Sequence, residues 1–327
     1  MVAMALDIGS RTHAVAATDS WVCPDGAVAN QASALSALFA RLAARDAQAW
    51  VVMEATGVYH WQAALLAHQA GLRVAVLNPK VTANFARALG RRSKTDRLDA
   101  QTLLLYAQRM SLVAWQPPRQ AVIELRAISR YLQSVTEQLT AAKNRLHAEL
   151  SLGEAPRFVL QALELEIEGL QQRIEQGVAE AQTRISADPE LSAQYQALDS
   201  ITGVAAHSAI ALLGELAWLP QDMRGRACVA HAGLDVRQHQ SGTSVAKPGR
   251  LTKHGNGHLR RALYMPALCA IRHDRHAKAF YERLVARGKK KMQALCAVMR
   301  KLLTAAWALM KSRSTYDSSL LFAQQEA

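Results

Sequence analysis

Residues 2–8, VAMALDI, are the stretch from which the fold can be worked out. Every residue in it except Asp7 is apolar, which predicts a short buried β-strand that ends in a carboxylate. Residues 13–18 (HAVAAT) follow across a short turn at Gly9–Arg11 and predict the antiparallel partner of this strand. The chain therefore is expected to begin with a β-hairpin that places Asp7 at one end of a sheet.

Strands and helices alternate outward from this hairpin. Residues 49–55 (AWVVMEA) predict a second buried strand, and residues 73–79 (RVAVLNP) predict a third that Pro79 ends. The segments between and after these strands have the spacing of helices: 33–45, 61–70, 80–89 and 96–109. The alternation predicts an α/β layer with some parallel strands.

A heptad pattern replaces this alternation after WQPP (115–118), a candidate domain boundary. Apolar residues recur at spacings of three and four over 122–150 and again over 163–185, with LGEAP (152–156) between them. The pattern predicts a helical hairpin, which is either a pair within one monomer or an oligomerisation arm. We expect three regions: an α/β domain over 1–115, a coiled-coil arm over 116–195 and a mainly helical domain over 196–327.

The net charge of +13 predicts a polyanionic partner. Residues 1–150 hold 16 Lys and Arg against 10 Asp and Glu, and residues 200–327 hold 20 against 7. Residues 151–199 have the opposite balance, 3 against 9. The two ends are therefore expected to face phosphates, and the acidic arm is expected to contact protein.

Composition also argues against several classes. The four cysteines are far apart with no CxxC pair, so a zinc site is not expected. We expect the cysteines to be reduced thiols in the cytoplasm. The N-terminus has no cationic region followed by an apolar run, which argues against a signal peptide. No uncharged apolar stretch of about 18 residues predicts a membrane span.

Four carboxylates form a candidate metal site. Two end predicted strands and two lie one turn apart at the start of a predicted helix, where they share a face. Oxygen ligands suit Mg²⁺ or Mn²⁺, and two such ions can assist phosphoryl transfer. We call these residues the four acids: Asp7, Glu54, Asp96 and Asp99.

Each of the four acids also has a structural alternative. Asp7 could form a turn or belong to the DxG of an actin-like ATPase, Glu54 could lie at the surface, and Asp96 could cap a helix together with Thr95. The ATPase alternative lacks support because the sequence has neither Asp-Gly-Gly nor GxxxxGK[ST].

Four cations lie before and between the helix-borne pair of acids. They fit a nucleic-acid backbone that passes the metal site, although a solvated charged helix start is the alternative. These candidate nucleic-acid contacts are Arg91, Arg92, Lys94 and Arg97.

Residues 237–261 form a second, strongly basic segment that is rich in Gly, Ser and Thr, and its composition is typical of a phosphate-binding loop. Ser241 there is either a phosphate contact or a nucleophile on phosphorus. The candidate nucleic-acid contacts in this segment are Lys247, Arg250, Lys253, Arg260 and Arg261.

Three features near this segment have open interpretations. Residues 199–216 (DSITGVAAHSAIALLGEL) are either half of a phosphate-binding helix–hairpin–helix or an ordinary capped helix. Tyr264 either stacks on a base or packs in the core. Residues 287–292 (RGKKKM) are either a phosphate-contacting run or a solvated one.

The chain as a whole resembles the DEDD transposases of insertion-sequence family 110 (IS110), the bridge-RNA-guided recombinases. The resemblance rests on residues 5–16, 51–104, 198–216 and 231–268, and it follows the order of the family along nearly the whole chain. The most specific parts are K-T-D-x-x-D-A, at residues 94–100, and S-G-x-S followed by L-x-K-x-G and L-R-R-A-L, between residues 241 and 263.

The resemblance implies a RuvC-like (RNase H-like) domain, a coiled coil and a transposase domain, in that order. The four acids match the metal-binding acids of the family, and Ser241 matches its serine nucleophile, with Ser244 three residues further on. Members cut and rejoin target and donor DNA through a phosphoserine, within a dimer of dimers, and a structured bridge RNA pairs with both DNAs. A RuvC-like nuclease that uses water and a non-catalytic scaffold remain the alternatives.

Overall fold

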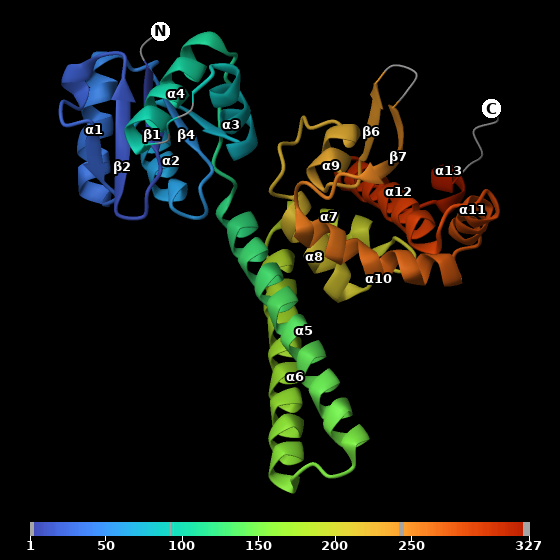
Figure 1. Cartoon of the computed structure of the whole chain (residues 1–327). Helices are drawn as coiled ribbons and strands as arrows, with labels where there is room; N and C mark the ends of the chain where they lie inside the picture. The colour runs from blue at the N-terminus through green and yellow to red at the C-terminus, as the bar shows by residue number, and fades with distance from the viewer. Residues whose placement is uncertain (1–2, 92, 94, 242–244, 323–327) are drawn as a thin grey trace. The chain divides into compact units, whose positions relative to one another are not determined.

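The computed structural model describes residues 3–322 except 92, 94 and 242–244. The chain forms two compact units, residues 1–117 and 118–327 (Figure 1). The first unit contains a sheet covered by helices. The second contains a long helical hairpin, a cluster of helices and a two-stranded sheet.

The first unit has a mixed five-stranded sheet in the order β3-β2-β1-β4-β5. β1 pairs antiparallel with β2, and parallel with β4, which in turn pairs parallel with β5. The three predicted buried strands and the N-terminal hairpin are thus confirmed. The strands are β1 (Ala3–Asp7), β2 (Thr12–Ala17), β3 (Ala27–Ala29), β4 (Trp50–Glu54) and β5 (Arg73–Leu77).

Helices cover both faces of this sheet because alternate strand residues point to opposite sides. Met4, Leu6 and Met53 pack in one core with α1 and α2, and Ala3 and Val52 pack on the other side with Ala107 of α4. The elements are η1 (Ser20–Val22), α1 (Ala32–Arg45), α2 (His60–Gln69), α3 (Pro79–Ala88) and α4 (Asp96–Arg109).

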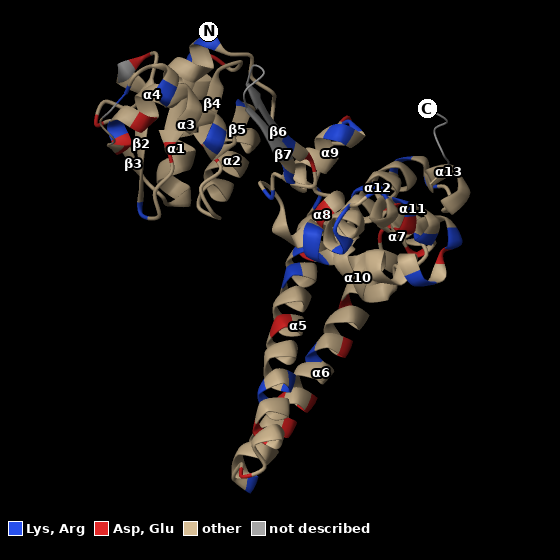
Figure 2. Ribbon diagram, turned by 45° about the vertical axis from the view of Figure 1, so that its right-hand side comes forward, with Lys and Arg blue, Asp and Glu red and all other residues tan. Residues whose placement is uncertain are grey.

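The predicted helical hairpin consists of α5 (Gln120–Leu152) and α6 (Arg157–Ser186), which we call the arm (Figure 1). Its heptad residues form the contact: Val135, Ala142 and Leu170 are buried together. Gly177 is required at one point of this contact, because an added Cβ would lie 2.6 Å from a methyl carbon of Leu132. Figure 2 shows Asp and Glu along α6, which fits the acidic balance of this region.

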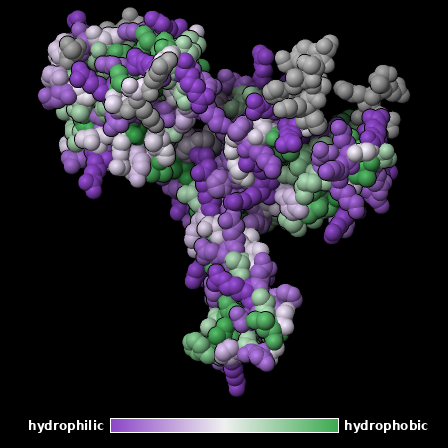
Figure 3. All heavy atoms as spheres, viewed as in Figure 1, coloured by the Kyte–Doolittle hydropathy of each residue, from purple (hydrophilic) through white to green (hydrophobic). Residues whose placement is uncertain are grey.

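The free end of the arm exposes large apolar side chains, visible in green in Figure 3. Leu150, Leu152 and Phe158 are 58%, 72% and 79% exposed. Because these side chains are exposed, they are available for a contact outside the monomer.

The remaining helices pack around α8, whose residues Ala209–Leu216 are all buried. The buried helix fits the structural alternative for residues 199–216. Gly203 (φ +92) makes the turn before α8, where a Cβ would lie 2.6 Å from the Pro266 carbonyl oxygen. The helices are α7 (Pro189–Asp199), α8 (Ala206–Leu216), α9 (Gly225–His231), α10 (Gly257–His273), α11 (Arg275–Ala286), α12 (Lys291–Ser312) and α13 (Ser318–Phe322).

One expectation for this unit is wrong. Residues 237–241 and 245–251 do not lie in a loop, because β6 (Val236–Ser241) and β7 (Val245–Leu251) pair as antiparallel strands. Their sequences are polar and contain Pro248 and Gly249, so they lack the alternation of apolar residues by which strands are recognised. The architecture is otherwise the expected α/β part followed by a mainly helical part.

The described part of the chain contains no disulfide bond. All four cysteines are free. No helix among the described residues has the length and apolar character that crossing a bilayer requires.

Candidate functional site

The fold brings the four acids to one end of the first sheet. Asp7 is the last residue of β1 and Glu54 the last of β4, and these neighbouring parallel strands pair with Leu6 opposite Met53. Asp96 and Asp99 lie in the first turn of α4, a helix that contacts β1. Thr95 is the N-cap of that helix, since its Oγ1 accepts a hydrogen bond from Leu98 N at 3.3 Å.

The four acids line one pocket of about 460 Å³, which we call the acidic pocket. Asp7, Glu54 and Asp99 are half-buried, whereas Asp96 is exposed. Residues from three separate segments of the sequence thus contribute carboxylates to a single hollow. Thr82 of α3 and Arg91 also line it.

Carboxylate oxygens are the donor type that Mg²⁺ and Mn²⁺ require, so the chemistry of the pocket fits these ions. Among the described residues, however, no three Asp, Glu, His or Cys side chains lie close enough together to ligate one metal ion. The side chains of the four acids would therefore have to turn toward a common point to bind a cation.

Thr82 is a site residue that the sequence did not indicate. Its Oγ1 lies 2.6 Å from Glu54 Oε2 and donates to it, and the side chain is buried. This hydrogen bond fixes the Glu54 carboxylate from the neighbouring helix. Nothing in the local sequence distinguishes Thr82 from any other helical threonine.

His13 of β2 lies near the turn that follows Asp7, although it is not among the residues that line the acidic pocket. It is fully buried, its Nδ1 accepts a hydrogen bond from Gly9 N at 3.2 Å, and its Nε2 has no partner among the described residues. Burial lowers the pKa of this imidazole, which favours the neutral form that accepts from Gly9. A histidine in an otherwise apolar strand, HAVAAT, was the available signal.

The predicted cations beside the acidic pocket have different environments. Arg91 Nη1 donates to Leu98 O and Thr102 Oγ1, both at 2.7 Å, so Arg91 ties the segment before α4 to that helix. Arg97 is exposed. Arg92 and Lys94 lie outside the described residues.

Ser241 ends β6 in the second unit, opposite Val245 of β7. Residues 242–244, which include the alternative Ser244, lie outside the described residues. Asp235 and Thr252 close the base of the hairpin: Thr252 N donates to Asp235 O at 3.0 Å, and Thr252 Oγ1 to Asp235 Oδ1 at 2.5 Å. This double contact fixes the base of the strands that carry Ser241.

The basic residues of this region follow the hairpin. Lys247 pairs with His239 in the ladder, and exposed Arg250 pairs with Arg237. Lys253 comes next and adopts a left-handed backbone conformation (φ +51).

Arg260 and Arg261 follow in the first turn of α10. Arg260 Nη1 donates to Ala232 O at 2.8 Å, and Arg261 forms an ion pair with Glu137 of α5. Within the described side chains, Arg250 and Lys253, like Arg260, form no ion pair, whereas Arg261 does.

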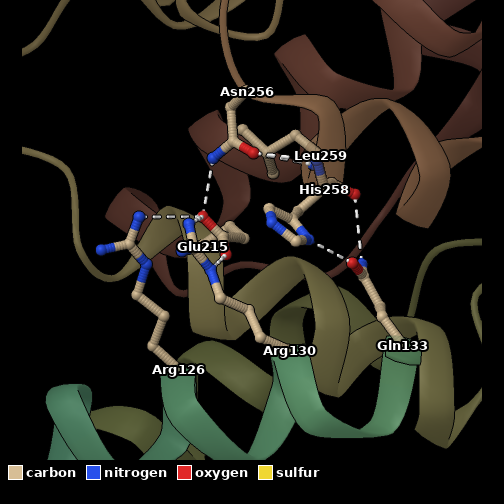
Figure 4. A network of polar contacts seen from close by, with 7 residues as sticks. All are labelled: Arg126, Arg130, Gln133, Glu215, Asn256, His258 and Leu259. Atoms are coloured by element: carbon tan, nitrogen blue, oxygen red, sulfur yellow. Dashed lines mark hydrogen bonds and ion pairs between the residues drawn. The ribbon is translucent and has the colours of Figure 1, made fainter. Parts of the chain in front are cut away.

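A buried polar network holds the start of α10 in place (Figure 4). Glu215 of α8 is 1% exposed and accepts from Arg130 Nε and from Asn256 Nδ2, both at 2.6 Å, and from Arg126 Nη2 at 3.3 Å. Asn256 is the N-cap of α10, its Oδ1 accepting from His258 N at 3.0 Å. Glu215 thus links the base of the arm to the segment that follows the serine-bearing hairpin.

The surroundings of Glu215 strongly favour the ionised carboxylate over the protonated acid. Burial by itself raises the pKa of this carboxyl, but the hydrogen bond from Arg130, the Arg126 charge and the Asn256 amide outweigh it and hold the pKa at about 2. The sequence IALLGEL around Glu215 is apolar and gives no sign of these partners.

Two models of protein families match this sequence. The model described as "Transposase", built on the DEDD transposases of IS110, matches residues 4–152, which contain all four acids. The model described as "Transposase IS116/IS110/IS902 family" matches residues 181–282, which contain Ser241, Glu215 and Asn256.

Whole-length relatives agree with the family models. The pilin gene-inverting protein of Moraxella bovis is 30% identical over 277 residues, covering 83% of this chain and 82% of the relative. The transposase for insertion sequence element IS1111A of Coxiella burnetii is 25% identical over 297 residues, covering 81% and 79%. The chain belongs to the IS110 family of transposases and is a DNA recombinase.

Proposed function

We propose that this transposase cuts and rejoins DNA through a covalent phosphoserine at Ser241, at a site where the four acids hold Mg²⁺ or Mn²⁺. The observation that carries the proposal is the acidic pocket, which carboxylates from β1, β4 and α4 line together. Carboxylates at strand ends beside a helix-borne pair also support an RNase H-like (RuvC-like) fold for the first unit.

The proposed strand exchange would keep the energy of the phosphoester bond at each step. The Ser241 hydroxyl oxygen would form a bond to phosphorus while a DNA hydroxyl leaves and takes up the proton, and attack by another DNA hydroxyl would reverse the exchange. A divalent cation in the acidic pocket would stabilise the developing charge on the phosphate oxygens. Because a phosphoester replaces a phosphoester at each step, no nucleotide hydrolysis is needed, which fits the absence of a P-loop motif from the sequence.

The proposal includes the partners that the family resemblance implies. A structured bridge RNA would pair with target and donor DNA, and the basic residues around both sites would contact phosphates. The acids of one subunit would act with the serine of another in a dimer that assembles to a tetramer in the cytoplasm. The exposed apolar end of the arm supports a contact between subunits.

A denaturing gel of protein mixed with labelled DNA, Mg²⁺ and the element's RNA tests the chemistry. The wild-type protein should form a DNA–protein adduct, and Ser241→Ala should form none, whereas Ser244→Ala should retain it. Asp7→Ala and Asp99→Ala should lose cleavage, and Asp222→Ala, at an exposed acid outside the pocket, should not.

Other results would assign a different function. DNA cleavage without an adduct in Ser241→Ala would indicate a nuclease that uses water. Unchanged DNA effects in Asp7→Ala and Asp99→Ala would indicate a scaffold. Sequencing of RNA that co-purifies with the protein expressed beside its element would test the bridge RNA separately.

A further inference from the structure

A second pocket, between α10 and α12, has no role in the proposed strand exchange. Its volume is about 540 Å³, within the roughly 300–1,000 Å³ typical of small-molecule sites. The side chains of Met292, Cys296 and Met299 from α12 form an apolar wall, and Tyr264 of α10 lies opposite with Arg260 and Arg261. We call this the α10–α12 pocket.

The apolar surface of this pocket is open to solvent. Tyr264 is 40% exposed and Met292 is 55% exposed, although their neighbours Leu263 and Leu295 are 1% and 4% exposed. Tyr264 therefore does not act as a core residue. An aromatic ring beside polarizable thioethers provides a flat surface on which another ring can stack.

Positively charged side chains lie in and beside this pocket. Arg260 and Arg261 lie on the α10 side, and the lysines 289–291 directly precede Met292 on the α12 side. These three lysines are exposed and form no ion pair within the part of the chain that the structure describes. Burial raises the pKa of the Cys296 thiol, while Lys253 acts in the opposite direction, so that lysine also lies near the pocket.

The α10 wall of the pocket is held rigidly. Gln133 of α5 contacts His258 twice: Nε2 donates to the backbone oxygen at 3.2 Å, and Oε1 lies 2.5 Å from the ring Nδ1 (Figure 4). Arg260 is fixed by its bond to Ala232 O. A site whose supporting residues are already hydrogen-bonded loses little entropy on binding.

We propose that the α10–α12 pocket binds one unpaired nucleotide of a DNA or RNA strand. Its base stacks on Tyr264 and Met292, and its flanking phosphates pair with the lysines 289–291 and with Arg261, which would exchange its partner Glu137 for a phosphate. This combination of an aromatic surface with surrounding cations is the one that recognises single-stranded nucleic acid. The proposal rests on the nucleic-acid binding in the proposed function, but it concerns a different set of residues.

Fluorescence anisotropy with the full-length protein tests the proposal. The probes are labelled single-stranded oligothymidylate, oligouridylate of equal length, and an abasic strand of equal length. Tyr264→Ala should weaken binding of a base-bearing strand by about tenfold, since stacking of one base contributes on the order of 1–3 kcal/mol. Binding of the abasic strand should not change. The relative affinities of the DNA and RNA probes identify which strand the pocket prefers.

Two variants control for folding and position. Tyr264→Phe retains the ring and should bind both base-bearing strands as the wild type does. Tyr131→Ala removes a tyrosine that is 50% exposed on α5, outside the pocket, and should have no effect. A strand containing 5-iodouracil should form its photochemical cross-link at Tyr264 or Met292.

Three results would overturn the proposal. Tyr264→Ala could lose affinity equally for abasic and base-bearing strands, or it could lose no affinity at all. The wild-type protein could also bind abasic and base-bearing strands equally well. A pocket that bound acidic peptides in place of the oligonucleotides would also overturn it. Failure of the phosphoserine proposal can be distinguished from failure of the pocket proposal. Ser241→Ala should lose the DNA–protein adduct and keep the base-dependent binding.

Discussion

At the scale of single residues, Glu215 combines deep burial with full ionisation. Its two arginine partners come from the base of the arm, and its amide partner caps α10. Arg126 also lies over the ring of Trp218, with the guanidinium carbon 4.0 Å from the ring centroid. One carboxylate therefore joins three elements that are distant in the sequence.

Replacing this carboxylate should be costly. We expect Glu215→Gln to lower the free energy of unfolding by about 3 kcal/mol, the lower end of the range for a broken buried ion pair, because Arg130 is partly exposed. Chemical denaturation at neutral pH measures the loss. Glu175→Gln, at an exposed glutamate of α6, is the control and should change the free energy by less than about 0.5 kcal/mol.

The pH dependence of stability should follow the same residue. The folded pKa of about 2 lies below the ordinary value of 4.5, so the contribution of Glu215 is complete above about pH 4.5 and is lost as pH falls toward 2. Unfolding free energies measured across this interval should fall less steeply for Glu215→Gln than for the wild type. Parallel curves would show that another group causes the acid sensitivity.

Thr82 should tune the proposed metal site through Glu54. Loss of its hydroxyl in Thr82→Val leaves the Glu54 carboxylate free to turn, and removal of such a supporting hydrogen bond typically reduces metal affinity by about 10–100-fold. The Mg²⁺ concentration for half-maximal DNA cleavage should rise accordingly. Thr82→Ser keeps the hydroxyl and should stay close to wild type, and equal Mg²⁺ requirements in all three proteins would contradict the role.

At the scale of elements, the arm owes its stability to one contact line between α5 and α6. The second unit buries Leu125 and Leu132 where α5 enters the helical cluster, and further out only the seam between the two helices is buried. The outer part of the arm therefore depends on a few apolar residues. Its exposed end is unsupported by the rest of the unit.

Two leucines of α6 allow a matched test. Leu170 is 2% exposed and packs with Val135 and Ala142, whereas Leu165 is 69% exposed. We expect Leu170→Ala to destabilise the hairpin by about 2–5 kcal/mol, and Leu165→Ala to have almost no effect. Hydrogen exchange of the α5 and α6 amides should accelerate only in Leu170→Ala, and similar exchange in the two variants would refute this packing.

At the scale of the whole molecule, charge is distributed by region. The residues before and after the arm carry the excess of Lys and Arg, while the arm itself is acidic. Attraction to nucleic acid is therefore concentrated on the sheet-containing unit and on the helices that follow the arm. The acidic balance of residues 151–199 makes this part of the arm the least suited to contact phosphates.

Nucleic-acid binding should consequently be strongly salt-dependent. Affinity for a mixed-sequence DNA duplex should fall by orders of magnitude between roughly 50 and 200 mM salt, because each phosphate contact releases counterions. Arg250→Gln should reduce the slope of log affinity against log salt by about one. Anisotropy titrations at several salt concentrations measure both, and a slope near zero would contradict phosphate binding by the basic residues.

The sequence by itself determined the elements whose apolar residues repeat with a clear period. Such patterns predict strands β1, β4 and β5, helices α1 to α4 and both helices of the arm. An element that buries one face must repeat its apolar residues with the period of that element. The four acids could be selected as well, since each lies where a predicted element ends or begins. The strands β3, β6 and β7 could not be predicted from the sequence. β3 has only three residues, and β6 and β7 are polar, so none of them shows a period of apolar residues.

Only the tertiary structure decided which side chains from distant parts of the sequence come into contact. The Thr82 hydroxyl on Glu54, the partners of Glu215 and the α10–α12 pocket each join residues at least 28 positions apart or from separate helices. Local propensity fixes the backbone of each element, but packing chooses which faces come together. Polar pairs of this kind leave no pattern in the sequence, because a buried glutamate or an exposed tyrosine differs from others only by its neighbours in space.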